Sequence, residues 1–311
     1  MDFLAYLGFR IFVWFVNSLP GRLALLLGSV MGSVAFRAHT KGKELVVNNI
    51  MRAFGKEKKE EEARSVALSF YRNMGMGVVE FARLKKIDKG YIEENVIFEG
   101  CAHIDAGLKK GKGVVILTAH FGNWELLNCA MALKGYTMSV VVRPIDNIYM
   151  NSFIEGVRTK FGNRMIEKKN ALGRITELLR NNGIVGILLD QRAGRKDGIE
   201  VDFFGIPAQT SKGLAAVVGR TGSSVIPAFI RREGFSRHRV TFLSPLELSD
   251  SGDRAGRIRE NTQRFTRAIE NFIRKYPEEW FWFHSRWERR KKREGRMALK
   301  RARHKWLGLF G

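Results

Sequence analysis

The sequence predicts an α/β fold: a mixed, mostly parallel sheet flanked by helices. From residue 113 onward, apolar runs typical of buried strands alternate with segments of helical periodicity. Such alternation indicates strands joined by right-handed helical crossovers and covered by helices on both faces. At 311 residues the chain is also long enough to build one large α/β domain with a substantial core.

The individual elements follow from the periodicity. Strands are expected at residues 114–119, 137–143, 184–189 and 224–230, and the helices that separate them at about 124–134, 147–161, 170–181 and 211–221. A last amphipathic helix is expected at about 256–275. Residues 203–208 are expected to form a tight apolar loop, and the basic segment 231–239 is expected to border a late hairpin.

Two apolar stretches precede this domain. Residues 3–16 are apolar apart from Arg10, Pro20 and Gly21 break the run, and residues 23–36 form a second stretch. Neither is a clean span of about 20 apolar residues, and no cleavage signal is visible, so a retained anchor or a pair of interfacial helices is favoured over a core helix pair. The predicted organisation is therefore a membrane-associating segment at 1–40, the α/β domain at 41–285 and a basic tail at 286–311.

The charge of the chain predicts an anionic partner. Lys and Arg number 54 against 31 Asp and Glu, a formal net charge of +23. Nucleic acid, anionic lipid headgroups and an acidic carrier protein all match this charge. The two cysteines, Cys101 and Cys129, form no ligand cluster, which indicates a reducing compartment and no zinc site. Phosphate-loop, nucleophile-elbow and zinc-protease motifs are missing, and neither a metal nor a bound cofactor is expected.

The strongest candidate for chemistry is His120, at the end of the strand expected at 114–119. Ligands of open α/β sheets bind outside the carboxyl ends of the strands, and an imidazole there can take a proton from a hydroxyl. Glu125, five residues on, is expected to orient His120 and stabilise its cation. The alternatives are a structural histidine that caps a helix and a first-turn acid that only complements the helix dipole.

Residues around His120 are candidates for substrate binding. Gly122 and Asn123 precede the helix, where exposed amides can bind an oxyanion or a phosphate, although ordinary turn chemistry explains them equally well. Arg143 ends the next strand along the chain and is expected at the same rim.

Several blocks together resemble one family. They are His120-x4-Glu125, residues 141–144, the helix with Arg158, residues 188–192, residues 203–208 and residues 225–229. In order and spacing they resemble the bacterial lipid A late acyltransferases of the lysophospholipid acyltransferase superfamily. The resemblance implies a glycerolipid-acyltransferase-like fold. It also implies direct transfer of a fatty acyl chain from acyl carrier protein, or from acyl-CoA, to a hydroxyl of an anionic glycolipid, a lipid A precursor, at the cytoplasmic face of the inner membrane.

The resemblance also points to an arginine at or near Arg158 and to the Asp190-Gln191 pair as parts of the site. A guanidinium can grip a substrate phosphate bidentately, and Asp190 can hold that guanidinium or a sugar hydroxyl. The structural alternatives are an ion pair of Asp190 with Arg192 or Arg195, and a plain surface charge at Arg158.

Two other functions remain open at this point. The first is a transferase of the same fold with another acceptor, such as a lysophospholipid, an ornithine lipid or a mannosylated glycolipid. The second is a non-catalytic protein that binds a membrane or nucleic acid. The basic tail at 286–305, with Trp287 and Trp306, suits a headgroup interface. No nucleic-acid-binding motif is recognisable, and the intact His120 and Glu125 argue for an enzyme.

Overall fold

A seven-stranded sheet organises the computed structural model, which describes residues 2–168, 171–250 and 252–287. Its strand order is β1-β9-β8-β2-β5-β3-β4, and only β8 and β9 pair antiparallel. The strands are β1 (Val96–Glu99), β2 (Val114–Thr118), β3 (Ser139–Val142), β4 (Arg164–Glu167), β5 (Ile184–Leu188), β8 (Ser224–Glu233) and β9 (Arg237–Phe242), and β6 (Gly198–Phe203) and β7 (Ile206–Ser211) form a separate antiparallel pair. The predicted mixed, mostly parallel sheet is confirmed.

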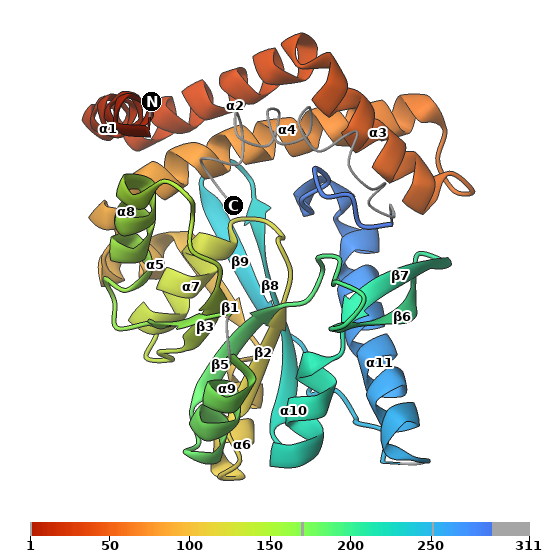
Figure 1. Ribbon diagram of the computed structural model, residues 1–311. Helices are drawn as coiled ribbons and strands as arrows, with labels where there is room; N and C mark the ends of the chain where they lie inside the picture. Colours follow the sequence, from red (N-terminus) through yellow and green to blue (C-terminus); the bar gives the residue numbers. More distant parts are fainter. Residues whose placement is uncertain (1, 169–170, 251, 288–311) are drawn as a thin grey trace.

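Helices cover both faces of the sheet and one of its ends. They are α1 (Asp2–Ser18), α2 (Gly21–Ala38), α3 (Thr40–Phe54), α4 (Glu60–Arg83), α5 (Lys89–Asn95), α6 (Cys101–Lys109), α7 (Trp124–Leu133), α8 (Ile148–Arg158), α9 (Ala171–Arg180), α10 (Gly213–Thr221) and α11 (Arg254–Lys275), with short 3₁₀ turns η1 (Leu84–Lys86) and η2 (Pro277–Glu279). Helices α5 to α8 share a hydrophobic cluster on one face, and α9 to α11 share a cluster on the other. Figure 1 shows α1 to α4 as a helical layer across one end of the sheet.

Strand β2 lies between the two hydrophobic clusters, which explains its unbroken apolar sequence. Val115 and Leu117 belong to one cluster, and Val114 and Ile116 belong to the other. A parallel strand buried on both faces has no polar side to alternate with, so it reads as a continuous apolar run. This central strand carries His120 just beyond its carboxyl end.

Each of the four predicted strands and five predicted helices corresponds to an element of the structure, within a few residues at their ends. The strands β1 and β4 were not predicted, because each is short and carries charged side chains. The late hairpin expected at the basic segment 231–239 is confirmed by the antiparallel pairing of β8 and β9. The expected loop at 203–208 is wrong. It belongs to the β6–β7 hairpin, whose tight turn places Phe204 at φ +58° and Gly205 at φ +71°.

The N-terminal helices combine a tightly packed face with an exposed apolar one. Side chains at Gly28 or Gly32 of α2, or at Gly75 of α4, would overlap the backbone of the facing helix, so the two helices touch at their main chains. The exposed large apolar residues of α1 and α2 are Phe3, Leu4, Leu7, Ile11, Trp14, Phe15, Leu23, Leu26, Val30, Met31 and Val34. Exposed apolar patches of this extent mark interaction surfaces.

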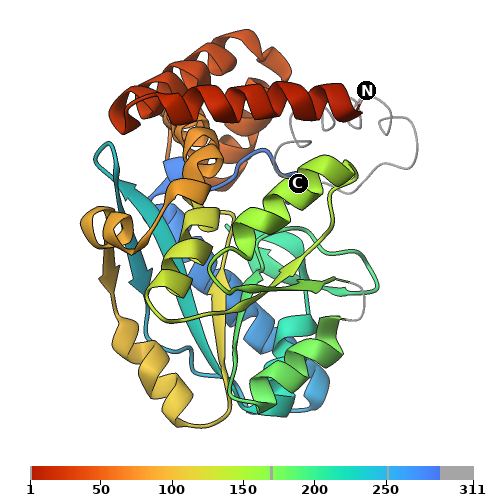
Figure 2. The same cartoon turned by 90° about the vertical axis from the view of Figure 1, so that its left-hand side faces the viewer.

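Helix α1 also contacts the α/β domain directly. Its amino-terminal half lies beside α8, as Figure 2 shows, with the ring of Phe9 5.1 Å from that of Phe153 and Tyr6 stacked on Tyr149. Within the described residues, α2 is the one helix whose length and composition would allow it to cross a membrane.

Candidate active site

The loop after β2 is held in place by the end of η2 and the residues that follow it. Phe121 and Trp280 form an isolated antiparallel bridge, the amide of Phe281 donates to the carbonyl of His120 at 2.9 Å, and the amide of Gly122 donates to the carbonyl of Glu279 at 2.8 Å. These bonds join residues about 160 positions apart. They hold His120 at the carboxyl end of β2, where the sequence placed it.

Asp190 is the carboxylate that binds His120. β5 pairs parallel with β2, and the amide of Leu189 donates to the carbonyl of Thr118, so Asp190 emerges beside His120. Its Oδ1 lies 2.9 Å from Nδ1 of His120, and its Oδ2 accepts from the His120 amide at 3.1 Å and from Nε1 of Trp280 at 2.8 Å.

The environment keeps Asp190 ionised. Burial alone would raise the pKa of this carboxyl, but the charge and hydrogen bonds of His120, together with the Trp280 bond, lower it to about 2. An ionised carboxylate at Nδ1 favours the tautomer that carries its proton there and leaves a lone pair on Nε2. Asp190 therefore orients the imidazole, and the alternative of a structural ion pair with Arg192 or Arg195 does not describe its contacts.

Nε2 of His120 is directed toward the accessible side of the site. The amide Nε2 of the exposed Gln191 donates to it at 3.1 Å, and 21% of the His120 side chain is exposed. The indole of Trp124 packs edge-to-face on the imidazole, with ring centroids 5.2 Å apart, and Phe281 contacts both rings. Trp124 therefore forms a wall beside the imidazole.

The prediction that Glu125 orients His120 is wrong. Glu125 instead forms a forked ion pair with Arg158: Nε of Arg158 lies 3.2 and 3.0 Å from the two carboxylate oxygens, and Nη2 lies 2.5 Å from Oε1. Both side chains are largely buried. Burial would lower the pKa of Arg158, but the Glu125 carboxylate raises it overall. Arg158 is therefore a positively charged side chain that the ion pair with Glu125 fixes in place, and the alternative of a plain surface charge is wrong.

Gly122 and Asn123 have structural roles in the turn. The Gly122 amide is already bonded, its φ is +56°, and any side chain would overlap the backbone at Ile230, so the glycine is required by the fold. Asn123 caps α7 by accepting from the amide of Leu126 at 3.0 Å. The expectation that these two residues bind an anion is therefore not supported by the geometry.

The remaining predicted residues, Arg143 and those of the basic tail, do not contact His120 in the described part of the chain. Arg143 is exposed after β3, at the same edge of the sheet, but β5 separates β3 from β2 and the described residues show no contact between Arg143 and His120. Arg286 and Trp287, assigned to the tail, are buried, and Arg286 donates to the carbonyl of Gln209 at 2.7 Å. The rest of the predicted tail, 288–311, lies outside the described residues.

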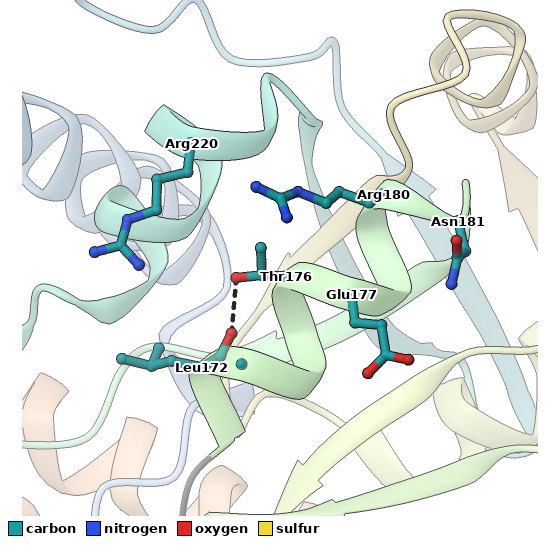
Figure 3. Close-up of a pocket in the computed structure, with 7 residues that line it drawn as sticks. Leu172, Thr176, Glu177, Arg180, Asn181 and Arg220 are labelled. Atoms are coloured by element: carbon teal, nitrogen blue, oxygen red, sulfur yellow. Dashed lines mark hydrogen bonds between the residues drawn. The ribbon is translucent and has the colours of Figure 1, made fainter.

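A surface pocket lies elsewhere, between α9 and α10 (Figure 3). Its lining is Leu172, Gly173, Thr176, Glu177, Arg180, Asn181 and Arg220. Helix α9 runs away from the carboxyl edge of the sheet, and Asn182 beyond its end bonds the amide of Gly113, at the start of β2. None of the candidate residues lines this pocket. Over the described parts of the chain, no group of three or more His, Cys, Asp and Glu is placed to hold a metal ion.

A histidine held by a buried carboxylate at the carboxyl edge of a mostly parallel sheet is typical of α/β enzymes that use a general base. Comparison with known proteins identifies the family. Residues 2–289 match the family model for bacterial lipid A biosynthesis acyltransferases, so the chain belongs to this family and is an acyltransferase.

Individual relatives agree with this assignment at low identity. The chain is 24% identical over 289 residues to the lipid A biosynthesis lauroyltransferase of Escherichia coli K12, covering 92% of each chain. It is 24% identical to the lipid A biosynthesis palmitoleoyltransferase of the same organism, over 89% of each chain. It is also 28% identical to a phosphatidylinositol mannoside acyltransferase of Mycobacterium tuberculosis, over 61% of this chain and 60% of the relative.

Proposed function

We propose that this protein transfers a fatty acyl chain from a thioester, on acyl carrier protein or coenzyme A, to a hydroxyl of an anionic glycolipid, in the first place a lipid A precursor. The observation that carries the proposal is His120, held by ionised Asp190 at Nδ1 while Nε2 is directed outward. Family membership supplies the class of reaction.

The proposed reaction needs no enzyme nucleophile, because a thioester is already activated. Nε2 of His120 takes the proton of the acceptor hydroxyl as its oxygen attacks the thioester carbonyl. When the tetrahedral intermediate collapses, the C–S bond breaks, and the leaving thiolate takes from the imidazolium the proton that came from the acceptor hydroxyl. Asp190 stabilises the imidazolium between these two steps.

The Glu125–Arg158 pair is proposed to bind anionic substrate. Glu125 uses Nε and Nη2 of Arg158 and so fixes the plane of the guanidinium, while one fifth of the Arg158 side chain stays exposed. A guanidinium fixed in this way can still donate to a phosphate oxygen from its remaining N–H groups. Gln191 and Arg143 are proposed as further contacts on the same edge of the sheet.

Two classes of acceptor match the relatives of this chain. Relatives at similar identity include both lipid A transferases and phosphatidylinositol mannoside acyltransferases. A mannosylated phospholipid is therefore the second candidate. Both acceptors carry sugar hydroxyls and phosphate. The proposed base His120 can act on a hydroxyl, and Arg158 can bind a phosphate. Nucleic acid is not proposed as a partner.

The protein is proposed to work at the cytoplasmic face of the inner membrane. The exposed apolar side chains of α1 and α2 face away from the domain, while the backbone contact at Gly28 and Gly75 binds α2 to α4. Such a helix pair can lie in the interfacial region with its apolar face among the acyl chains. We also propose a glycerolipid-acyltransferase-like architecture for the domain. The proposed organisation is a membrane-associating segment at 1–40, the acyltransferase domain at 41–285 and a basic tail at 286–311.

The proposal is tested with purified full-length protein in detergent, acyl carrier protein and coenzyme A thioesters, and a panel of lipid acceptors, with products read by mass spectrometry. We expect acyl transfer to a lipid A precursor or to a mannosylated phospholipid. We also expect no acylated protein when the acceptor is omitted, since burial raises the pKa of the Cys129 thiol to about 12. A stable acyl-protein adduct that forms without acceptor and reacts on when acceptor is added would contradict direct transfer.

A further inference from the structure

A second set of ionisable side chains lies buried behind the His120 turn, where α4, β8, β9 and η2 meet. It consists of Glu80, Arg232, His238 and Glu279. Glu80 and Glu279 are less than a tenth exposed, and His238 is 1% exposed. Burying charged groups costs free energy unless they are paired and hydrogen-bonded.

Glu80 is the centre of this cluster. Its Oε2 accepts from Nη2 of Arg232 at 2.7 Å and from Nδ2 of Asn123 at 2.8 Å, and its Oε1 lies 3.5 Å from Nε2 of His238. Burial would raise the pKa of Glu80, but Arg232 and His238 hold it well below its usual range. The bond to Asn123 is therefore a charge-assisted one, stronger than a bond between neutral groups.

Asn123 connects Glu80 to the active-site turn. Its Nδ2 binds Glu80 while its Oδ1 caps α7 at Leu126, so both ends of one amide are used. Asn123 stands between His120 and Glu125, and Glu125 holds Arg158. The adjacent Gly122 is bonded to the carbonyl of Glu279, another member of the cluster.

We propose that Glu80 is a positioning residue, which acts through Asn123 to fix the turn between His120 and Glu125 and thereby aligns the base with the Glu125–Arg158 pair. The inference rests on the proposed function for these two groups. Glu80 touches neither substrate nor reacting atoms. It belongs to α4, the helix against which α2 packs, so the helical layer contributes to the active site through this side chain.

The test has to separate positioning from stability. Removing the Glu80 charge alone leaves Arg232 buried and unpaired, which would destabilise the fold whatever Glu80 does for the site. Two double variants avoid this problem. E80Q/R232M removes both charges but keeps an amide oxygen that can accept from Asn123, and E80L/R232M removes both charges and the acceptor.

We expect E80L/R232M to lose at least tenfold in kcat with KM changed less than threefold, and E80Q/R232M to recover most of that loss. The partly exposed carboxylate of Glu233, which pairs with Arg231 and Arg239, supplies the control E233Q, with kcat unchanged. N123S adds a variant that keeps a capping side chain but is too short to reach Glu80, and it is expected to behave like E80L/R232M. Equal kcat values for the two double variants, or wild-type kcat for N123S, would overturn the proposal.

A second measurement is independent of any substrate. The imidazole NMR signal of His120, assigned by its absence in H120A, is expected to shift in E80L/R232M and N123S but to stay near its wild-type position in E80Q/R232M. If the wild type transfers no acyl group to any acceptor while these shifts occur, the proposed function fails and the positioning role stands. If the His120 signal is identical in all variants, the positioning role fails. Where E80L/R232M does not fold, N123S alone decides.

Discussion

His120 and His238 are both paired with a buried carboxylate, yet their surroundings differ in the property that chemistry needs. His120 places Nδ1 2.9 Å from Asp190 and keeps a fifth of its side chain exposed, whereas His238 lies 3.5 Å from Glu80 and is sealed in the interior. A base needs one nitrogen held and the other reachable by substrate. The comparison shows that a histidine–carboxylate pair is a candidate site only when its second nitrogen lies on an accessible side, as Nε2 of His120 does beside the exposed Gln191.

The largest expected effect separates these two histidines. H120A removes the base and is expected to lower kcat roughly 10²- to 10⁴-fold with little loss of stability, because the side chain is only partly buried. H238Q is expected to keep kcat within about tenfold, and its cost is expected in the melting temperature instead. Steady-state kinetics and thermal unfolding of both variants check this. A kcat loss in H238Q as large as in H120A would remove the distinction.

The second prediction concerns the carboxylates. D190N keeps the shape at Nδ1 but neither stabilises the imidazolium nor enforces the tautomer, so kcat is expected to fall on the order of 10³-fold. E99Q, at an exposed carboxylate of β1 that pairs with Arg239, is the matched control and is expected to retain full activity. Full activity in D190N would mean that Asp190 does not hold the catalytic tautomer.

Next in size is the effect of the Glu125–Arg158 pair. R158K keeps the positive charge but loses the forked geometry, and we expect kcat/KM to fall roughly 10- to 100-fold, mainly through KM. E125Q is expected to lose less, because it leaves the guanidinium in place but less firmly held. Since Glu125 does not contact His120, kcat for E125Q is expected to stay far above that of D190N. A kcat loss equal to that of D190N would restore Glu125 as the orienter.

A smaller effect is expected on the pH dependence of the free energy of unfolding, through Glu279 of the buried cluster. Burial, with smaller contributions from the charges of Glu278 and Glu80, raises the pKa of Glu279 from 4.5 to about 7 against the opposing effect of Arg232. Between these values the native state holds a proton that the unfolded state has lost, so this carboxyl makes the free energy of unfolding fall as pH rises from about 4.5 to 7. E279Q keeps an acceptor for the Arg232 amide and removes the ionisation. Denaturant unfolding of E279Q is expected to show an advantage of up to about 3 kcal/mol over wild type at pH 7.5 that disappears near pH 4.5. An advantage independent of pH would contradict the assignment.

The smallest effect on chemistry is expected at the membrane-facing helices. W14E and L26E place charges on exposed apolar positions of α1 and α2, so they are expected to weaken flotation with liposomes while kcat on detergent-dispersed acceptor changes less than twofold. T176E, at a partly exposed position of α9 in the surface pocket, is the control for added charge. Unchanged flotation of both variants would show that this surface does not bind membrane.

Local pattern was enough to predict His120 but not its partner. A buried strand, a turn and a helix are all read from neighbouring residues, and they put His120 at the end of β2. Its carboxylate lies 70 residues away and arrives only because β5 pairs beside β2. Strand order is not encoded in periodicity, so the nearest acid in the sequence, Glu125, was chosen instead.

Other parts of the site were found by resemblance or not at all. Arg158 and Asp190 were singled out because their blocks resemble a family, although their contacts could not be derived from spacing. Trp280, which donates to Asp190, stood in a visible aromatic cluster, but no sequence rule assigns an indole N–H to a carboxylate 90 residues away. Glu80 gave no signal, since its position in an amphipathic helix looks like any other.

The glycine contact between α2 and α4 has a consequence for protein engineering. Deleting residues 1–36 would be the obvious route to a detergent-free preparation, but it would strip α4 of its partner and uncover Val79 and Ala82, which are now buried. The truncated chain would lose the exposed apolar surface of α1 and α2 but would expose an apolar surface on α4 instead. A soluble version is better sought by recoding the outward positions of α1 and α2 with polar residues while Gly28, Gly32 and Gly75 stay untouched.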